Sequence, residues 1–380
     1  MVHLNSIFVH SVIAVAATAY KLPELSGPYA VGTETLDLTD YSRLDPLAPS
    51  TPQLRELMVT IFYPTSNDTL QNGNHTFAPD FTPTAATYVD AYFGLPSGTA
   101  AEIETRSIPH APILNKKFPI LLFGHGFGGT RVIYTAQLED LASRGWIIAS
   151  IDHTYDASYV EFSDGRVVPT PYTNSSQLPG GVEGAVKVRV DDLNFVADAL
   201  RNVTVLSRIP GLNSSSCRPQ LHTDQIGVFG HSLGGNAAAT AMANNTRFRC
   251  GANFDGTIFG SVAQTGLDRP FLQMAAQDHN QTNDASWAEF WDNLRGFRRE
   301  YTVKNTVHLS FTDSPIIRDS VGDAFPAGQD AIYGSISGDR VLRIETAYID
   351  AFFGYCLKNK PAADLDALSG IQFPEVSVGH

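Results

Sequence analysis

The stretch that decides the fold is Phe229-Gly230-His231-Ser232-Leu233-Gly234-Gly235. It follows a mostly apolar run at 225–229, which predicts a buried strand, and precedes the alanine-rich residues 236–243, which predict a helix. A G-x-S-x-G motif between a strand and a helix is typical of a nucleophile elbow, a strained turn that exposes a serine hydroxyl at the positive end of the helix. Gly230 and Gly234 leave room where a Cβ would clash with neighbouring backbone. The alternative interpretation is a glycine-rich loop around an ordinary helix-capping serine.

Two apolar runs upstream of this motif, 118–123 and 146–152, predict strands that are buried on both faces of a sheet. Residues 131–144 between them have helical periodicity, and Gly145 stands where a helix C-cap is expected. Strand, helix and strand in this order form a β-α-β unit with a right-handed crossover. Because the alternation continues downstream, we expect the α/β class: an α/β-hydrolase fold with a mostly parallel central sheet, helices on both faces and loop insertions.

The remaining patterns are shorter. Strands are expected at 57–63, 251–255, 270–275 and 301–307, and helices at 85–93, 185–202, 284–299 and 341–357. Segments 64–111 and 154–184 are rich in turn-forming residues and predict loop insertions, which often line a substrate entrance. Residues 20–45 are predicted to be irregular, and the tail after Pro361 is predicted to be loose. Residues 20–380 contain no internal repeat and no linker, which predicts a single domain.

The net charge and the cysteine count limit which binding partners and cofactors are expected. The 380 residues include 39 acidic and 26 basic side chains, for a formal net charge of −13. Nucleic acids and anionic membrane surfaces are themselves negative, so this charge disfavours both as partners. Cys217, Cys250 and Cys356 allow at most one disulfide, whose pairing stays open, and none has metal-ligand spacing. We therefore expect no metal and no organic cofactor.

Residues 1–19 have the pattern of a secretory signal peptide, with a short apolar stretch before the small residues Ala17-Thr18-Ala19 as a cleavage site. The stretch is too short to predict a membrane span, and a buried N-terminal helix or strand is the alternative. Sequons for N-linked glycans begin at Asn67, Asn74, Asn174, Asn202, Asn213, Asn244 and Asn280. These features predict a secreted, extracellular glycoprotein.

A serine hydroxyl needs a base within hydrogen-bond reach, and that base needs an orienting acid. In the α/β-hydrolase fold these residues follow the order serine, acid, histidine along the chain. With Ser232 as the nucleophile, we expect His308 at the end of the last predicted strand to be the base; His279 also follows a strand but fits this order less well. Asp255 and Asp278 end successive predicted strands after the motif, and spacing alone leaves the choice of acid between them open.

An oxyanion hole requires two backbone N–H groups aimed at the developing negative oxygen. Leu233, the residue after the nucleophile, is expected to supply one of them. The glycine-rich loop 124–130 follows an earlier strand, and we expect the other donor to be Phe127, whose ring would line the acyl pocket. The glycines of this loop superficially resemble a dinucleotide-binding pattern, but the spacing of the third glycine does not fit it.

Several of these motifs resemble the secreted, plasma-type platelet-activating-factor acetylhydrolases. They are the loop 124–131 with 141–148 and Asp152-His153 behind it, residues 230–235, the run Arg247-Phe248-Arg249-Cys250-Gly251 that leads to Asp255, Val307-His308 with Phe311, Gly27-Pro28-Tyr29 and Phe62-Tyr63-Pro64. The resemblance covers most of residues 25–357. It implies Asp255 as the acid, because that family takes its acid from the strand right after the elbow helix. The related bacterial cutinase-like polyester hydrolases take it one strand later, which would imply Asp278.

Together, the residues and the resemblance predict a serine carboxylic-ester hydrolase that works through an acyl-enzyme, with Ser232, Asp255 and His308 as its triad. The resemblance implies short sn-2 acyl chains on a phospholipid such as 1-alkyl-2-acetylglycerophosphocholine, with transient contact to a lipid surface. A general short-chain carboxylesterase or a cutinase-like polyesterase is the alternative, and a non-catalytic lipid-binding module is the alternative of another class. Segments 64–111 and 154–184 differ from the animal enzymes, so acyl length, alcohol group and oligomeric state stay open.

Overall fold

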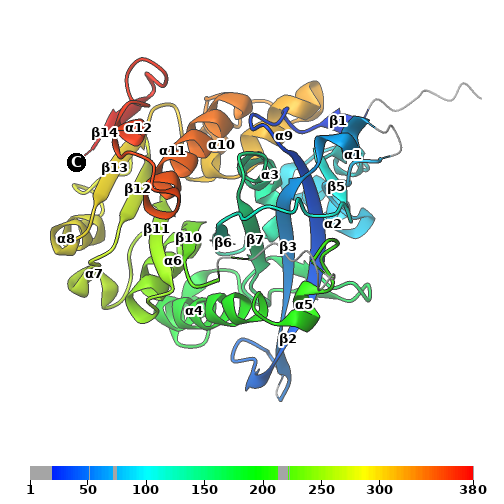
Figure 1. Ribbon diagram of the computed structural model, residues 1–380, viewed down its shortest axis with the longest axis horizontal. Helices are drawn as coiled ribbons and strands as arrows, with labels where there is room; N and C mark the ends of the chain where they lie inside the picture. Colours follow the sequence, from blue (N-terminus) through cyan, green and yellow to red (C-terminus); the bar gives the residue numbers. More distant parts are fainter. Residues whose placement is uncertain (1–18, 51, 72–74, 213–220, 222, 380) are drawn as a thin grey trace, which may run out of the picture.

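The computed structural model describes residues 19–50, 52–71, 75–212, 221 and 223–379. Within these ranges, ten strands form one sheet in the order β14-β13-β12-β11-β10-β6-β7-β3-β2-β5 (Figure 1). From one edge to the other they are β14 (Val376–Val378), β13 (Arg298–Val303), β12 (Phe271–Ala276), β11 (Phe248–Phe254), β10 (Ile226–His231), β6 (Ile120–Gly124), β7 (Ile147–Asp152), β3 (Leu54–Thr65), β2 (Ala30–Leu44) and β5 (Ser107–Pro109). The strands from β13 to β7 pair in parallel, whereas β14, β3 and β2 are antiparallel to their inner neighbours.

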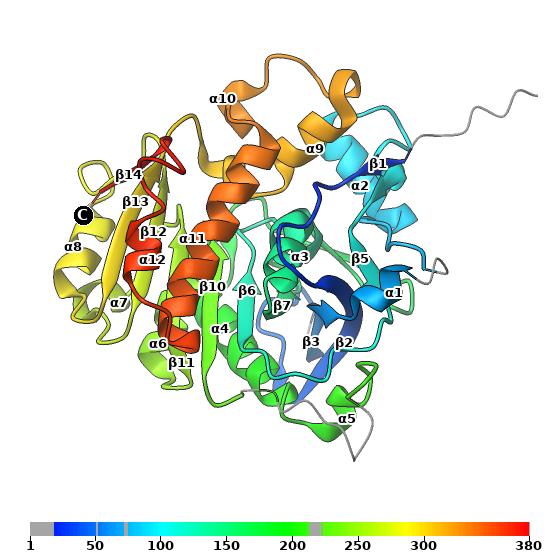
Figure 2. The same cartoon turned by 45° about the horizontal axis from the view of Figure 1, so that its top comes forward.

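Helices cover both faces of this sheet (Figure 2). They are α3 (Thr135–Ser143) and α11 (Gly338–Lys358) on one face, and α4 (Gly181–Ala199) and α6 (Leu233–Asn244) on the other. Side chains alternate between the faces along a strand, so a strand covered on both sides is apolar throughout. In β6, Ile120 and Leu122 join the cluster beneath α4 and α6, whereas Leu121 and Phe123 join the cluster beneath α3 and α11. The predicted layers are confirmed.

Shorter elements lie around the sheet. The helices are α1 (Asn67–Gln71), α2 (Pro83–Phe93), α5 (Val203–Leu206), α7 (Val262–Thr265), α8 (Ala285–Asn293), α9 (Ser314–Val321), α10 (Asp330–Tyr333) and α12 (Ala363–Asp366). The small strand pairs are β1 (Tyr20–Lys21) with β4 (Ile103–Glu104), and β8 (Tyr159–Glu161) with β9 (Val167–Pro169). The predicted helix at 85–93 is confirmed as α2, which begins at Pro83 after a Thr82 cap and ends at a left-handed Gly94.

A disulfide joins Cys250 of β11 to Cys356 of α11 and so ties the sheet to a covering helix. The expected features that lie outside the described residues are Cys217, residues 1–18 of the signal peptide, and the sequons at Asn74 and Asn213. The asparagines of the other sequons are exposed. Among the residues that the structure describes, no helix is both long enough and apolar enough to cross a membrane.

The expectation that residues 20–45 are irregular is wrong. β2 is a strand of 15 residues, paired with β3 along most of its length. Leu36 and Leu38 are buried, whereas Thr35 and Asp37 are more exposed. This is the two-residue alternation of a half-buried strand, and acidic residues of weak strand propensity obscured it in the sequence.

The expectation of a loose tail after Pro361 is also wrong, because this segment forms α12 and the edge strand β14. The strand predicted at 301–307 lies earlier, at Arg298–Val303, where it pairs with β12. The predicted helix at 284–299 is therefore too long. Its last residues, Arg298 and Arg299, belong to β13, and α8 ends at Asn293. His308 was expected at the end of this strand, but a short connection separates it from the end of β13.

Candidate active site

Ser232 occupies the turn between β10 and α6. Its φ of 55° and ψ of −122° lie outside the regions that residues with a side chain ordinarily adopt, so the turn is strained. Backbone hydrogen bonds hold it there: the Ser232 N–H donates to Phe254 O (2.8 Å), and the Ser232 carbonyl accepts from Gly235 N–H (3.0 Å). The Ser232 side chain makes no capping hydrogen bond to α6, so the interpretation as an ordinary helix-capping serine is wrong.

Close backbone packing explains the glycines of the motif. A Cβ on Gly234 would lie 2.0 Å from the carbonyl oxygen of Gly124, and a Cβ on Gly230 would lie 2.5 Å from the same oxygen. No side chain fits at either position, so both must be glycine. A Cβ on Gly126 would lie 3.2 Å from the Cβ of Ser232, so the glycine-rich loop lies directly beside the serine.

Asp255 and His308 meet next to this turn. Asp255 follows β11 with a φ of 57° and is 5% exposed. Its Oδ2 lies 2.7 Å from Nδ1 of His308, which begins the 3-10 turn His308–Phe311. Burial would raise the pKa of Asp255, but hydrogen bonds from His279 and His308 outweigh it and lower the pKa to about 2. Asp255 is therefore an anion at neutral pH.

A chain of hydrogen bonds joins the glycine-rich loop to the backbone of His308. His231 Nε2 donates to His308 O (2.9 Å), and Nδ1 of His231 lies 2.9 Å from Oη of Tyr134. Burial and the neighbouring His308 lower the pKa of His231 to about 3, so this ring is neutral and its Nδ1 accepts from Tyr134. Tyr134 in turn accepts from Gly126 N–H (3.1 Å).

A second imidazole, that of His279, contacts Asp255. His279 Nδ1 lies 2.8 Å from Asp255 Oδ1, and its Nε2 lies 3.0 Å from Asp284 Oδ2. Burial opposes the charged form, but hydrogen bonds to Asp255 and Asp284 raise the pKa of His279 to about 9. No sequence pattern indicates this contact, because the turn after β12 carries His279 back toward β11 and spacing along the chain does not show that.

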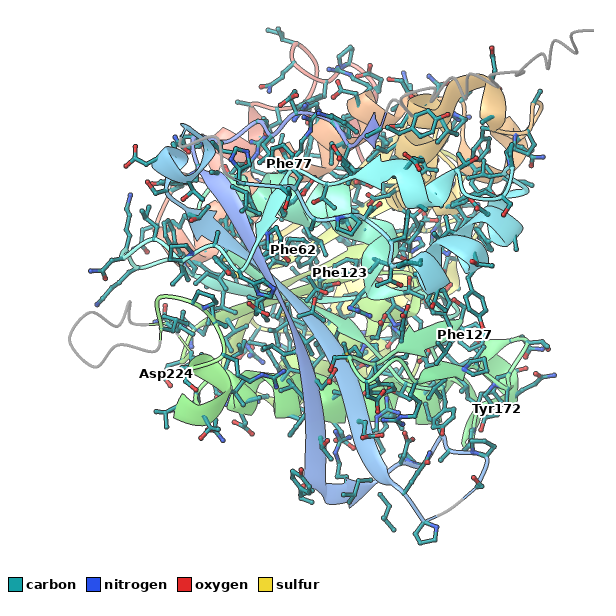
Figure 3. All side chains as sticks on the ribbon, turned by 90° about the vertical axis from the view of Figure 1, so that its right-hand side faces the viewer. Phe62, Phe77, Phe123, Phe127, Tyr172 and Asp224 are labelled. Atoms are coloured by element: carbon teal, nitrogen blue, oxygen red, sulfur yellow. A yellow bond between two sulfur atoms is a disulfide. The ribbon has the colours of Figure 1, made fainter. Side chains whose placement is uncertain are left out.

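Two backbone N–H groups beside Ser232 are free. In the described residues, those of Phe127 and Leu233 have no hydrogen-bond acceptor, whereas those of Gly126, Gly128 and Gly129 are all used. Leu233 is the first residue of α6, where no carbonyl of the helix can accept its N–H. Figure 3 shows Phe127 farther out than Phe123, which lies within β6. The free donors are those that the sequence predicted for an oxyanion hole.

A buried ion pair holds the loop that carries Phe127. Arg189 of α4 donates from Nε and Nη2 to the two carboxylate oxygens of Asp156, both at 2.6 Å, and from Nη1 to His125 O. Asp156 O accepts from Gly128 N–H at 3.1 Å. Neither charged side chain has exposed surface. The pair therefore fixes both ends of the segment 125–128.

Two cavities meet at Ser232 and His308. The first, of about 470 Å³, is mainly apolar, and its wall includes Tyr88, Tyr92, Phe93, Phe127, Ile133, Tyr134, Tyr159 and Leu309. The second, of about 750 Å³, is mainly polar, and its wall includes Ser175, Thr257, Asp278, His279, Asn283, Asp284 and Ser286. An ester bound at Ser232 would have an apolar space on one side and a polar space on the other.

The structure brings Ser232, Asp255, His308, Phe127 and Leu233 to one place, the carboxyl end of the parallel strands. The competing acid Asp278 is exposed at the rim of the polar cavity, and His308 bonds to Asp255 instead. Among the described residues, no cluster of His, Cys, Asp and Glu side chains is arranged to hold a metal ion.

Known proteins are similar to this chain over most of its length. The sequence-family model described as platelet-activating factor acetylhydrolase, isoform II, matches residues 14–164 and 186–349. A probable 1-alkyl-2-acetylglycerophosphocholine esterase of Arthroderma benhamiae is 30% identical over 94% of either chain. The platelet-activating factor acetylhydrolase of Cavia porcellus is 21% identical over 88% of this chain and 78% of its own. The solved structure of a ferulic acid esterase from Streptomyces cinnamoneus superposes with a TM-score of 0.80 and 30% identity, covering 95% of this chain and all of that one.

Proposed function

This chain belongs to the platelet-activating factor acetylhydrolase isoform II family, has the α/β-hydrolase fold and is a carboxylic ester hydrolase, and on that premise we propose that Ser232, His308 and Asp255 are its catalytic triad. One observation carries the proposal. The hydrogen bond of 2.7 Å from His308 Nδ1 to Asp255 Oδ2 lies beside a serine on a strained elbow, and the three follow the order serine, acid, histidine.

In the proposed reaction, Ser232 Oγ attacks the ester carbonyl while His308 Nε2 takes its proton. Collapse of the tetrahedral intermediate releases the alcohol, which receives that proton, and leaves an acyl-enzyme on Ser232. His308 then takes a proton from water, whose oxygen attacks the acyl carbonyl. Collapse of this second tetrahedral intermediate breaks the bond to Ser232 Oγ, which receives the proton back from His308, and releases the carboxylic acid. Asp255 holds the imidazole in the required tautomer and stabilises its cation.

The free N–H groups of Phe127 and Leu233 are the proposed oxyanion donors. In the described residues neither of these N–H groups has an acceptor, and a tetrahedral oxyanion needs two such groups. The dipole of α6 adds favourable potential at the same point, because Ser232 stands at the N-cap position directly before the first residue of the helix. Removing one such donor typically costs about 3 kcal/mol of transition-state stabilisation.

We propose a substrate that joins an apolar group to a polar one, because an apolar and a polar cavity meet at the serine. The phospholipid 1-alkyl-2-acetylglycerophosphocholine, named in a relative, has this division. The structural neighbour is named a ferulic acid esterase, so an ester of an aromatic acid is also a candidate substrate. A short-chain carboxylesterase or a cutinase-like polyesterase of broader range is the second candidate, since the polar cavity is wide.

Export to an oxidising compartment is part of the proposal. The disulfide between Cys250 and Cys356 is of the kind that persists outside the cytosol. The sequence of residues 1–19 and the exposed sequon asparagines in the described residues agree with secretion and N-linked glycans. A short contact with a lipid surface would deliver a phospholipid substrate.

Ser232→Ala tests the nucleophile. We expect the variant to keep its melting temperature while turnover of p-nitrophenyl acetate and labelling by an organophosphate fall by more than about 10⁴-fold. Asp255→Asn should lower kcat by about 10⁴-fold and Asp278→Asn should not. Full turnover by the Ser232 variant would refute the proposal, and the reverse ranking of the two aspartates would assign the acid to Asp278.

A substrate panel then separates the candidate functions. It consists of 1-alkyl-2-acetylglycerophosphocholine, a long-chain phospholipid, a feruloyl ester, short p-nitrophenyl esters and a polyester film. A kcat/KM for the acetyl phospholipid well above that for the other esters is the expected result. Equal rates on all the soluble esters would favour a general carboxylesterase, and release from the film would favour a polyesterase.

A further inference from the structure

Asp255 shares its carboxylate between two imidazoles. Oδ2 accepts from His308 (2.7 Å), while Oδ1 accepts from Ala276 N–H (2.7 Å) and from His279 Nδ1 (2.8 Å). A triad acid needs only the first of these contacts to orient its histidine. The contact with His279 is therefore additional to the triad and requires its own explanation.

The hydrogen-bond pattern makes His279 a cation. Its two ring nitrogens each face a carboxylate oxygen, of Asp255 and of Asp284, and an ionised carboxylate only accepts. Both nitrogens must then carry a proton, which is the imidazolium form. The pKa of about 9 that these two hydrogen bonds give His279 against the opposing effect of burial agrees with this count.

The cation is held rigidly. Asp284 caps α8 by accepting from Ser286 N–H, and its Oδ2 also accepts from the hydroxyl of Thr257 (2.8 Å). The ring of His279 packs against Trp287, with 4.4 Å between ring centroids. These contacts come from two separate segments, 255–257 and 284–287, so His279 cannot turn away from Asp255 without breaking several of them.

We infer that His279 is a positioning residue: a fixed cation on Oδ1 of Asp255. Its charge limits how strongly the carboxylate of Asp255 stabilises a proton on His308. Ester hydrolysis therefore continues into mildly acidic solution. The inference rests on the triad proposed above. A base must be neutral to accept a proton, so whatever makes His308 harder to protonate extends activity to lower pH. The hydrogen bonds that Oδ1 of Asp255 accepts from Ala276 N–H and from His279 Nδ1 also fix the plane of the carboxylate.

The other charged and titratable groups around the pair do not replace this effect. Asp278 is exposed at the rim of the polar cavity, and Asp284 is already engaged with His279. His231, behind His308, is neutral, and Tyr134 is its hydrogen-bond donor. Arg189 is engaged with Asp156 on the far side of the glycine-rich loop.

His279→Asn is the variant of choice, because the Asn amide can keep a neutral donor near the position of Nδ1 while the charge is lost. One unit charge at the distance of a neighbouring side chain, in a partly buried site, shifts a titration by about one pH unit. We therefore expect the acidic limb of kcat/KM to move up by about one pH unit, which is about a tenfold loss of activity on that limb relative to the plateau. The position of the limb is the readout and not the height of the plateau, because His279 also lines the polar cavity.

The matched control is His110→Asn. His110 also pairs through Nδ1 with a carboxylate, that of Glu34 (2.8 Å), but it is exposed at the surface. Its pH profile should superimpose on that of the unchanged protein. A profile of His279→Asn that differs from the unchanged protein only by a constant factor at all pH values would overturn the inference and leave His279 a structural residue.

An NMR titration of the unchanged protein tests the charge of His279 without relying on activity or on a variant that folds. We expect both ring nitrogens to carry protons at about pH 7, and Asp284→Asn to lower the midpoint of that titration. A neutral His279 ring at about pH 7 would overturn the inference. Full turnover by Ser232→Ala would instead refute the triad, and the NMR result would be unaffected by it.

Discussion

Replacing Arg189 with methionine tests the buried ion pair behind the proposed oxyanion loop. The change leaves the carboxylate of Asp156 fully buried without its bidentate partner and removes a donor from His125 O. Breaking a buried pair in this way costs about 3–5 kcal/mol of unfolding free energy. At an unfolding entropy of about 2.1 cal/mol/K per residue, a chain of 380 residues has about 0.8 kcal/mol/K, so the melting temperature should fall by about 4–6 °C.

Thermal unfolding checks this magnitude, with Arg299→Met as the matched control. Arg299 binds Asp366 with the same two-bond geometry, at 2.7 Å and 2.9 Å, but that pair is exposed and its loss should cost less than about 1 kcal/mol. Equal melting temperatures for the two variants would refute the reasoning. Below its melting temperature, Arg189→Met should also lose about 10²-fold in kcat, because the N–H of Phe127 is displaced. An unchanged kcat would show that the loop keeps its position without the pair.

Two further predictions concern the elbow and the pH dependence of stability. Gly234→Ala should reduce stability by more than about 2 kcal/mol and abolish ester turnover, because its Cβ would lie 2.0 Å from Gly124 O; wild-type unfolding in urea would contradict this. Burial raises the pKa of Glu139 in α3 to about 8 despite hydrogen bonds from Arg106 N–H and the Ser107 hydroxyl, so its stabilising contribution is present at low pH and is lost as pH rises through about 8. The melting temperature should therefore drop between about pH 4.5, the ordinary pKa of a glutamate, and about pH 8, and Glu139→Gln should flatten that drop; an identical pH curve for the variant would assign the drop to other groups.

The centre of the fold could be predicted because its signals are local. The strands on either side of the elbow are apolar runs covered on both faces, and the glycines of the motif are imposed by a backbone contact with Gly124. The edges could not be predicted as well. In β2, Asp and Thr alternate with Leu36 and Leu38, and the strand forms because β3 pairs with it along the chain. The terminal strand β14 has three residues and depends entirely on β13.

The candidate site divides in the same way. Ser232, Phe127 and Leu233 belong to local motifs, so the roles proposed for them could be suggested from the sequence directly. The choice between Asp255 and Asp278 needed the resemblance to a family, because spacing fits either residue. The role proposed for His279 could not be predicted from the sequence, since its contacts with Asp255 and Asp284 depend on how the turn after β12 packs against α8. Such a contact is a property of tertiary packing and not of any motif.

Helix α2 supplies part of the wall of the apolar cavity, including Tyr88, Tyr92 and Phe93, whereas Ser232, Asp255 and His308 stand at or beyond the ends of central strands. Evolution can therefore alter the part of the wall that α2 supplies without disturbing the proposed triad. Exchanging α2 between distant homologues should yield chimaeras that accept new acyl groups while the proposed triad keeps its geometry. Diversification of this lineage toward different esters needs no change in its sheet.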